Sequence, residues 1–416
     1  MRRMQGLGFV MTILVVLLIE YYAFTAFKFA VRSMKFPFRQ LALGFYGLLT
    51  VIWFAMLLSL DYFRTADLDK GLRNVVIVYF MGLLLSKIII AIFLFLDDGR
   101  RLAYYLIGLF YSKESTPLSV QSGMSRSEFL TKFALLFGGT VFATVMYGMS
   151  NRYNYHIKKI KLTFAHLPKA FKGLKIVQIS DIHSGSFNDV AAVQKGVDMI
   201  LAEKPDLILF TGDLVNNKSD EMHDYISVFS KLKAPLGVYS ILGNHDYGDY
   251  VHWESHDAKH QNLKALKHVH AKLGWRLLLD EHVAIEKDGE QFGLIGVENI
   301  SGAQGFRSYG NLRNAYHGAH QYPFKILMSH DPSHWDSETI HAFKDIDLTL
   351  SGHTHGMQFG VEIPWLKWSP IQYVYKRWAG LYQKGHQYLY VNRGYGFLGY
   401  PGRVGILPEI TVIELV

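Results

Sequence analysis

The pattern of apolar positions divides the chain into two parts with different periods. In the first 150 residues, the apolar residues form long runs that are nearly free of charge. Four of these runs are long enough to cross a membrane, at about residues 8–30, 41–60, 74–96 and 133–150. Residues 41–60 contain no charge, and at ~1.5 Å per residue a helix of that length crosses a ~30 Å hydrocarbon layer. We therefore predict an N-terminal bundle of about four transmembrane helices.

Three details of the sequence concern the number of spans, the retention of the first one and the charges inside them. Residues 102–112 form an uncharged run too short to span, so we expect them to be interfacial or packed, with a fifth span left open. The first run is longer than the apolar core of a signal peptide, and we expect it to be retained. Glu20 and Lys87 lie inside the runs and could pair with each other or mark a transport path, although snorkelling or helix packing explains such residues more often.

After residue 173 the apolar runs become short, and each ends in a polar cluster. Five runs without alternation predict buried strands at residues 174–180, 207–211, 238–242, 324–329 and 348–351. Residues 188–204 have apolar positions at helical spacing, and Asn188 or Asp189 is placed to cap that helix. Strands that alternate with helices predict an α/β domain whose functional residues lie at strand ends.

Two further runs, at residues 292–297 and 410–415, predict additional strands, the last one closing this domain. Between the two parts, a cluster of basic residues is followed by Leu167-Pro168. We therefore predict a transmembrane helical domain at residues 1–150, a linker at residues 151–172 and a second domain at residues 173–416.

Charge and composition narrow the classes of function. The formal net charge is +8, but residues 1–150 hold 15 lysines and arginines against 8 acidic residues, and the remainder is nearly neutral. Cations beside membrane spans are expected near anionic headgroups, so this excess predicts membrane lipids as partners and no nucleic acid. All 19 histidines lie after residue 150, and the chain has no cysteine. Metal chemistry therefore belongs to the second domain and uses no thiolate.

The polar clusters at the strand ends contain a set of metal-ligating side chains. The set combines carboxylates, imidazoles and one amide: Asp181, His183, Asp213, Asn244, His330, His353 and His355. Side chains two apart in an extended segment point the same way, so each pair at this spacing is expected to converge. Ligands of this kind suit divalent ions, and a bridging carboxylate holds two ions ~3.5–4 Å apart for phosphoryl displacement. A turn explains any one cluster, but five in chain order favour a metal site.

These motifs carry a resemblance to a known family. The ordered set is Asp181-x-His183, Gly212-Asp213, Gly243-Asn244-His245-Asp246, His330 and Gly352-His353-x-His355. Over roughly residues 170–416, the chain resembles the calcineurin-like metallophosphoesterase superfamily. The resemblance implies an α/β fold, a four-layer α-β-β-α sandwich of two β-sheets flanked by helices, here preceded by the transmembrane bundle.

The resemblance also implies a role for each ligand. The first metal ion is expected on Asp181, His183 and His355. The second is expected on Asn244, His330 and His353, with Asp213 bridging both ions. The two divalent ions are manganese, zinc, iron or magnesium, and the sequence does not distinguish between these.

His245 is expected to be a catalytic residue rather than a ligand. By the same resemblance, it protonates the leaving oxygen or stabilises the phosphoryl charge, and Asp246 orients it. A function of a different class remains open, namely a membrane sensor or transporter subunit that uses an inactive phosphoesterase fold as a binding module. An inactive module usually lacks a ligand or the catalytic histidine, and the complete set here favours an enzyme.

The C-terminal segment is similar to a membrane-associated bacterial branch of the family. The similarity lies in residues 390–394, Pro401 and residues 408–410. That branch includes proteins resembling UDP-2,3-diacylglucosamine diphosphatases, and it implies an integral protein of the bacterial inner membrane. Met357 departs from the pattern, since a second glycine is usual after Gly356, and this departure leaves the substrate undetermined.

Taken together, these features predict a membrane-anchored phosphoesterase. We expect a metal-bridged hydroxide to hydrolyse a phosphate ester or diphosphate of a lipid-linked substrate near the bilayer. A tethered phosphodiesterase for a soluble substrate is the alternative enzyme. Aromatic and basic residues at 357–387, among them Trp365 and Trp368, fit either a membrane interface or acyl-chain pocket, or ordinary core packing.

The side of the membrane on which the second domain lies is less well determined by the sequence. The basic residues on the two sides of a four-span bundle are close in number, so the positive-inside rule does not decide. Compact basic loops at residues 32–39 and 100–101 favour an extracytoplasmic second domain.

Overall fold

The computed structural model describes residues 2–59, 70–110, 125–303 and 305–416. The chain separates into two compact units, Met1–Tyr147 and Gly148–Val416, which we call the transmembrane unit and, for the role that the family resemblance implies, the catalytic unit. The predictions made for residues 60, 111 and 112 lie outside the described residues.

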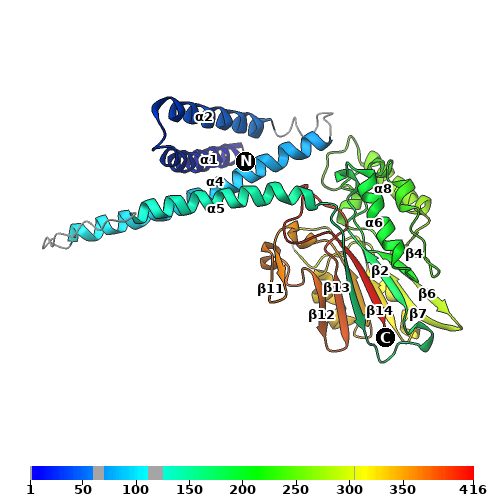
Figure 1. Ribbon diagram of the computed structural model, residues 1–416. Coiled ribbons are helices and arrows are strands. Elements are labelled where there is room, and N and C mark those ends of the chain that lie inside the picture. Colours follow the sequence, from blue (N-terminus) through cyan, green and yellow to red (C-terminus); the bar gives the residue numbers. More distant parts are fainter. Residues whose placement is uncertain (1, 60–69, 111–124, 304) are drawn as a thin grey trace. The chain divides into compact units, whose positions relative to one another are not determined.

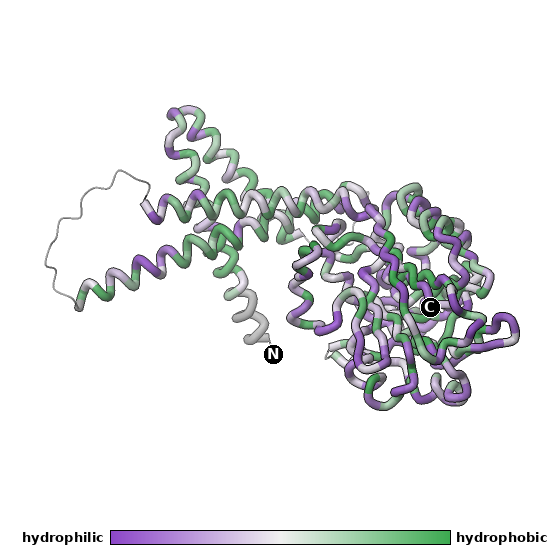
Figure 2. The backbone as a smooth tube through the Cα atoms, turned by 60° about the horizontal axis from the view of Figure 1, so that its bottom comes forward, coloured by the Kyte–Doolittle hydropathy of each residue, from purple (hydrophilic) through white to green (hydrophobic). Residues whose placement is uncertain are grey.

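The transmembrane unit contains four long helices, α1 (Arg2–Ala30), α2 (Phe36–Leu58), α4 (Lys70–Phe110) and α5 (Arg126–Gly148) (Figure 1). Four candidate spans, found by length and composition in the described residues, are Met11–Ala30, Phe36–Leu58, Lys70–Leu109 and Arg126–Asn151. Figure 2 shows apolar residues along most of each helix. An apolar cluster joins Ala26 of α1, Ile90 of α4 and Ala134 of α5. The prediction of four spans is confirmed.

Helix α4 is longer than one span and includes residues predicted to form a loop. Its 41 residues measure ~60 Å at ~1.5 Å per residue, about twice a ~30 Å hydrocarbon layer. Arg100 and Arg101 lie inside it and pair with Asp97 at 2.7 Å and Asp98 at 3.5 Å. The prediction of a basic loop at residues 100–101 is wrong, because pairing three positions apart lets the helix continue through the charges.

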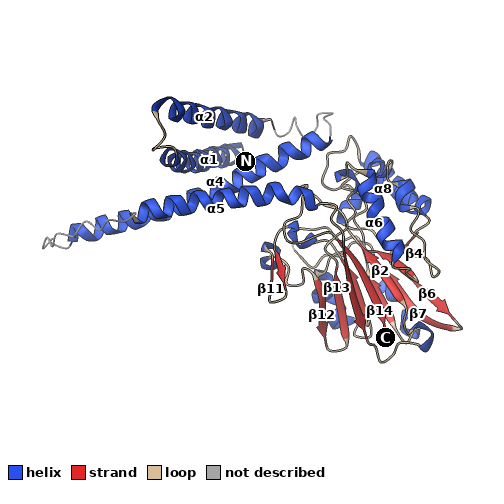
Figure 3. Cartoon of the chain, in the orientation of Figure 1, coloured by secondary structure: helices blue, strands red, loops and turns tan. Residues whose placement is uncertain are grey.

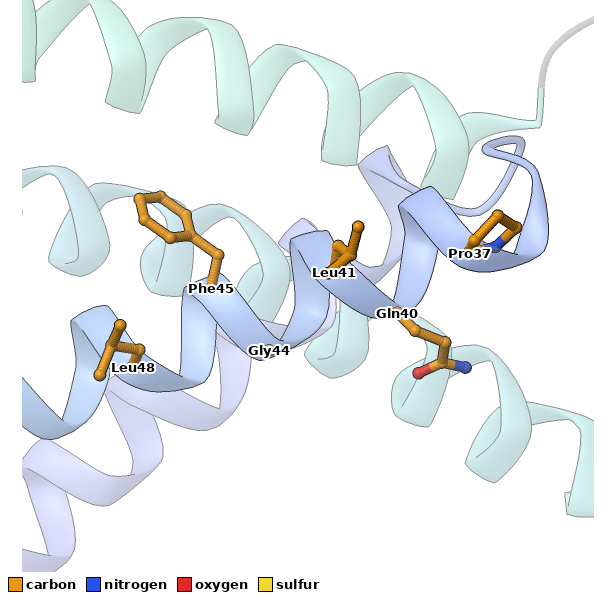
Figure 4. A pocket seen from close by; sticks show the side chains of 6 residues that line it. All are labelled: Pro37, Gln40, Leu41, Gly44, Phe45 and Leu48. Carbon is orange, nitrogen blue, oxygen red and sulfur yellow. The ribbon is translucent and has the colours of Figure 1, made fainter.

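Much of the surface of the transmembrane unit is apolar. Residues 102–109, predicted to be interfacial or packed, continue α4 with exposed side chains. On α2, Leu41, Phe45 and Leu48 line a shallow depression together with Pro37, Gln40 and Gly44 (Figure 4). Leu41 is 70% exposed and Phe45 61%. Contiguous exposed apolar side chains on a spanning helix fit contact with lipid acyl chains.

One polar cluster lies between the helices of this unit. Lys87 Nζ of α4 is 2.6 Å from Glu20 Oε2 of α1. The other oxygen of Glu20 accepts hydrogen bonds from Tyr46 at 2.7 Å and Thr50 at 2.9 Å, both on α2. Lys87 also lies 4.9 Å from the centre of the Trp53 ring. The structure therefore pairs Glu20 with Lys87, and the pair connects three helices.

The catalytic unit is built on two six-stranded sheets (Figure 3). The first has the order β1 (His156–Leu162), β14 (Glu409–Leu415), β2 (Lys175–Ile179), β3 (Leu207–Phe210), β4 (Val238–Ser240) and β5 (Arg276–Leu277). The second has the order β12 (Gly380–Lys384), β13 (Gln387–Val391), β9 (Leu348–Ser351), β8 (Lys325–Met328), β7 (Glu290–Gly296) and β6 (Glu281–Lys287). Within the two sheets, β2, β3 and β4 run parallel, as do β7, β8 and β9.

Apolar side chains join the two sheets face to face and attach helices to their outer faces. The inner cluster includes Ile176 and Leu209 from the first sheet and Leu294 and Leu350 from the second. The helices α6 (Val190–Ala202), α7 (Ile226–Phe229) and α8 (His256–Leu273) pack on the first sheet. The helices α9 (Leu312–Tyr316) and α10 (Ile340–Ala342) pack on the second. The predicted four-layer α-β-β-α sandwich is confirmed.

Strand β1 lies inside residues 151–172, the segment that the sequence predicts to be a linker. It pairs in parallel with β14, from His156↔Glu409 to Leu162↔Leu415. Its lysines give it the charged composition of a linker. However, β1 lies at the edge of the sheet, where charged side chains face solvent at little cost. The last candidate span, which ends at Asn151, therefore leads into the sheet almost at once.

Candidate metal centre

The strand ends of both sheets meet where the candidate ligands lie. Asp181, Asp213 and Asn244 follow β2, β3 and β4, and His330 and His353 follow β8 and β9. Because parallel strands end at the same edge of a sheet, each of these two groups lies along one edge of its own sheet. The buried amide of Gln178 on β2 donates to the Ser351 carbonyl at the end of β9, at 2.9 Å, and so ties the two edges together.

Three ligands form the first cluster. Ligand atoms of Asp181, His183 and His355 all lie within 4.8 Å of one another, and all three residues are buried. His355 Nε2 is 3.3 Å from Asp181 Oδ1. The backbone N–H of His353 donates to both oxygens of Asp181 at 3.0 Å and holds the carboxylate in place.

The second cluster contains Asp213, His330 and His353, again with ligand atoms within 4.8 Å. The Oδ1 atom of Asn244 joins it, 3.1 Å from His330 Nε2 and 2.8 Å from His353 Nδ1. Asp213 Oδ2 lies 3.1 Å from His330 Nε2 and 3.5 Å from His183 Nε2. One carboxylate oxygen therefore stands between the two clusters, where a bridging ligand would be needed.

The state of His183 tests whether these residues fit metal ions. The side chain is fully buried, and neither ring nitrogen has a well-formed hydrogen bond within the part of the chain that the structure describes. Burial lowers the pKa of His183 to about 3, so the ring is neutral and offers a lone pair. A buried polar atom without a partner costs ~1–3 kcal/mol. A divalent ion beside Asp181 and Asp213 would give a ring nitrogen of His183 a partner. The whole set of candidate ligands fits two such ions.

Hydrogen bonds to residues outside the two clusters orient the ligand atoms toward the middle of the site. His330 Nδ1 faces the Thr211 carbonyl at 2.8 Å and must donate to it, which leaves Nε2 free to bind a metal. His353 Nε2 contacts the Tyr375 hydroxyl at 2.8 Å, leaving Nδ1 on the side of the cluster. The Nδ2 atom of Asn244 donates to the Tyr250 hydroxyl at 2.8 Å, so that Oδ1 faces the histidines.

The sequence reasoning missed the roles of these two tyrosines. Tyr375 was one of several aromatic residues in the segment 357–387, and Tyr250 was not singled out. The fold brings each tyrosine into contact with its ligand, and no motif in the sequence marks either tyrosine.

The backbone at the ligands is left-handed rather than extended. Of the ten non-glycine residues with positive φ in the described chain, five are candidate ligands with φ between 49° and 73°: Asp181, His183, Asp213, His353 and His355. The expectation that paired ligands converge because their segment is extended is therefore wrong. Such conformations cost ~1–3 kcal/mol each and concentrate at functional sites, where the surrounding structure maintains them.

Two glycines explain how the ligand loops approach so closely. A Cβ atom on Gly352 would collide with the Ser180 and Asp181 side chains, and one on Gly212 would lie 2.9 Å from His330 Nδ1. Gly212 also has φ +96°, which side chains rarely adopt. The glycine of each motif therefore leaves room for a ligand from another loop.

His245 and Asp246 differ from the predicted arrangement. His245 Nδ1 contacts the Asn216 carbonyl at 2.8 Å. Asp246 instead accepts four backbone N–H groups, from Asp213, Leu214, Val215 and Gly243, at 2.9–3.2 Å. In the structure Asn216 contacts the His245 ring, and Asp246 holds the loop that carries Asp213. The side chain of Asp246 is short, and the nearby N–H donors of two loops satisfy both of its oxygens.

A cavity of about 200 Å³ opens onto the clusters. Its lining combines Asp213, Asn244 and four histidines with Phe306, Ile371, Tyr375 and Leu398.

Comparison with known proteins identifies the family. A family model described as Calcineurin-like phosphoesterase matches residues 174–357, and a second, for the transmembrane domain of such phosphoesterases, matches residues 4–152. The metallophosphoesterase YkuE of Bacillus subtilis is 30% identical over 303 residues, covering 70% of this chain and 98% of YkuE. The chain belongs to the calcineurin-like metallophosphoesterase family. Members of this family are metal-dependent hydrolases of phosphate esters, so the protein is an integral membrane metallophosphoesterase.

Two other relatives have more specific names. The phosphodiesterase YaeI of Escherichia coli is 29% identical over 247 residues, covering 58% of this metallophosphoesterase and 82% of YaeI. The UDP-2,3-diacylglucosamine pyrophosphatase LpxG of Chlamydia muridarum is 27% identical over 275 residues, covering 55% of this chain and 81% of LpxG. Both relatives are bacterial proteins, and the name of each describes an enzyme that acts on phosphate bonds.

Proposed function

We propose that this metallophosphoesterase hydrolyses a phosphate ester or diphosphate of a lipid-linked substrate. The observation that carries the proposal is the cavity, because candidate metal ligands and the apolar side chains of Phe306, Ile371 and Leu398 line it together. An amphiphilic phosphate presents the same two kinds of surface. The name of the Chlamydia muridarum relative, whose substrate carries acyl chains, supports the same substrate class.

In this proposal the ligands divide between two divalent ions. One ion would be held by Asp181, His183 and His355, and the other by Asn244, His330 and His353, with Asp213 as the ligand that both would share. When bound, such ions neutralise charge on the phosphoryl oxygens and activate water as the nucleophile. Their identity among manganese, zinc, iron and magnesium is left to measurement.

His245 supplies the proton in this proposal. Its Nδ1–H donates to the Asn216 carbonyl, which leaves Nε2 as the nitrogen that exchanges a proton at the cavity. There Nε2 protonates the leaving oxygen of the substrate. Asp246 acts indirectly, by holding the Asp213 loop in its left-handed conformation.

Metal content and substrate preference test the proposal together. We expect two divalent ions per chain by elemental analysis of the purified full-length protein at saturating metal. We also expect a long-chain lipid diphosphate to be hydrolysed much faster than its water-soluble head group. A single ion, or none, would contradict the binuclear centre. Equal rates on both substrates would instead favour the tethered phosphodiesterase for soluble substrates, the activity named for the Escherichia coli relative.

We further propose that the protein lies in a bacterial inner membrane with the catalytic unit on the extracytoplasmic side. The bacterial relatives support the compartment. The basic turn near Arg32 supports the orientation, although the second basic group at Arg100 lies inside α4. Labelling of a cysteine introduced at the exposed Val190, in intact cells with a reagent that cannot cross the membrane, tests this orientation.

A further inference from the structure

Exposed apolar side chains of the catalytic unit are concentrated in one segment. Among the described residues of this unit, eleven large apolar side chains are exposed, and eight of them lie between residues 357 and 381. These eight are Met357, Val361, Ile363, Trp365, Leu366, Tyr373, Val374 and Leu381. We call them the exposed apolar segment. Such a concentration of exposed apolar side chains in one segment indicates contact with something other than water.

The most exposed members lie at the tips of two short elements. Strands β10 (Val361–Ile363) and β11 (Leu366–Trp368) form an antiparallel hairpin, and Trp365 lies at its turn with 83% of its surface exposed. The following 3-10 turn ends at Tyr373, which is 78% exposed, and Val374 is 71% exposed.

Ion pairs and hydrogen bonds to the rest of the catalytic unit hold the base of the hairpin. The exposed residues at its tip therefore do not belong to a loose loop. Glu362 of β10 pairs with the buried Arg393 at 2.7 Å, and Arg393 also pairs with Glu409 of β14. On β11, the Lys367 ammonium donates to the Ala379 carbonyl and lies 4.9 Å from the centre of the Trp378 ring. Two polar anchors therefore fix the base of the hairpin and leave its apolar tip in solvent.

The aromatic residues of this region divide into two groups by position. Trp378 and Tyr375 are buried with Ile406 in an apolar cluster of their own, and they account for core packing. Trp365 and Tyr373 have no such packing. Trp and Tyr are the residues enriched at membrane interfaces, and Lys376, beside them, is an exposed cation of the kind that attracts anionic headgroups.

The catalytic unit is joined through the chain to the candidate membrane spans. The last candidate span ends at Asn151 and β1 starts at His156, so the catalytic unit is always within reach of a membrane surface. From the exposed apolar segment we propose that the β10–β11 hairpin and the Tyr373–Val374 tip insert into the headgroup region of the bilayer. Ile371 and Tyr375, next to this tip, also line the cavity, so the contact would place the mouth of the cavity at the lipid surface.

The absence of cysteine from the sequence allows a direct test. Trp365→Cys and Val374→Cys are labelled separately with an environment-sensitive fluorophore in the full-length protein, reconstituted in nanodiscs whose lipids carry nitroxide groups near the headgroup. Val190→Cys, at a 45% exposed position on α6, is the matched control. We expect strong quenching of the probe at 365 and 374 and much weaker quenching at 190, with metal content unchanged in all three variants.

The outcomes separate the proposed contact from its alternatives and from the proposed function. Equal quenching at the three positions would overturn the proposal. Absence of quenching at 365, together with crosslinking between copies through that cysteine, would assign the surface to a second copy of the chain and also overturn it. Since no substrate is present, the result does not depend on whether the enzyme prefers a lipid-linked phosphate.

Discussion

At the scale of single residues, Asp213 and His245 lie close together but touch different partners. Asp213 Oδ2 lies between the two ligand clusters, whereas the ring of His245 is held by Asn216 and lines the cavity. Asp213→Ala should therefore lose bound metal as well as turnover. His245→Ala should keep its metal and lose turnover by ~10²–10⁴-fold, the usual contribution of a general acid. Elemental analysis and turnover measured on the same preparations check both expectations.

A third residue, a histidine on the surface, provides the control for this pair. His256 lies at the start of α8 and is exposed, so His256→Ala should keep both metal and turnover. If His245→Ala emptied a metal position, the assignment of His245 to proton transfer rather than to metal binding would be wrong.

At the scale of the elements, the buried pair between Glu20 and Lys87 connects α1, α2 and α4. Removing one partner leaves a charge between the helices without compensation, and for buried pairs this costs ~3–5 kcal/mol. Lys87→Met should therefore strongly destabilise the transmembrane unit. The double variant Glu20→Gln with Lys87→Met should recover much of the loss, because neither charge remains. Thermal unfolding of the full-length protein in detergent measures this double-mutant cycle.

An exposed pair in the same unit gives a matched comparison. Lys132 and Glu128 on α5 are 3.1 Å apart, but the Lys132 side chain is 56% exposed. Exposed pairs contribute ~0–1 kcal/mol, so Lys132→Met should change stability little. Similar losses for Lys87→Met and Lys132→Met would show that the Glu20–Lys87 pair contributes no more than a surface pair does.

At the scale of the whole molecule, two units with separate apolar cores should respond differently to metal removal. Ions that bind only the folded state stabilise the unit that holds them. A chelator should therefore lower the protection of backbone amides from hydrogen exchange in the loops after β2, β3, β4, β8 and β9. The helices α1, α2, α4 and α5 should keep their protection.

Hydrogen exchange followed by mass spectrometry of the full-length protein, with and without chelator, measures this difference. Added manganese or zinc should restore the protection of the loops. Loss of protection spread equally over both units would mean that they unfold together, against the division into two cores.

The amino-acid sequence by itself determined the features that depend on local order along the chain. The length of the nearly uncharged runs indicated four spans, and short apolar runs indicated the strands β2, β3, β4, β8 and β9. The N-terminal cap of α6 at Asp189 was also predictable, since a capping side chain bonds a neighbour only three residues away, here the N–H of Ala192. The candidate ligands were visible because each lies only a few residues after the end of such a strand.

Only the tertiary structure decided the features whose partners lie far away in the sequence. Strand β1 is recognisable only beside β14, more than 200 residues later, because its own lysines break the apolar pattern. The left-handed backbone at the ligands, the bonds from Asp246 to the Asp213 loop, and the contacts of Tyr250 and Tyr375 all depend on loops brought together by two sheets. Likewise, Trp365 and Trp378 are equivalent by residue type, and only packing buries one and exposes the other, because burial depends on neighbours that composition does not reveal.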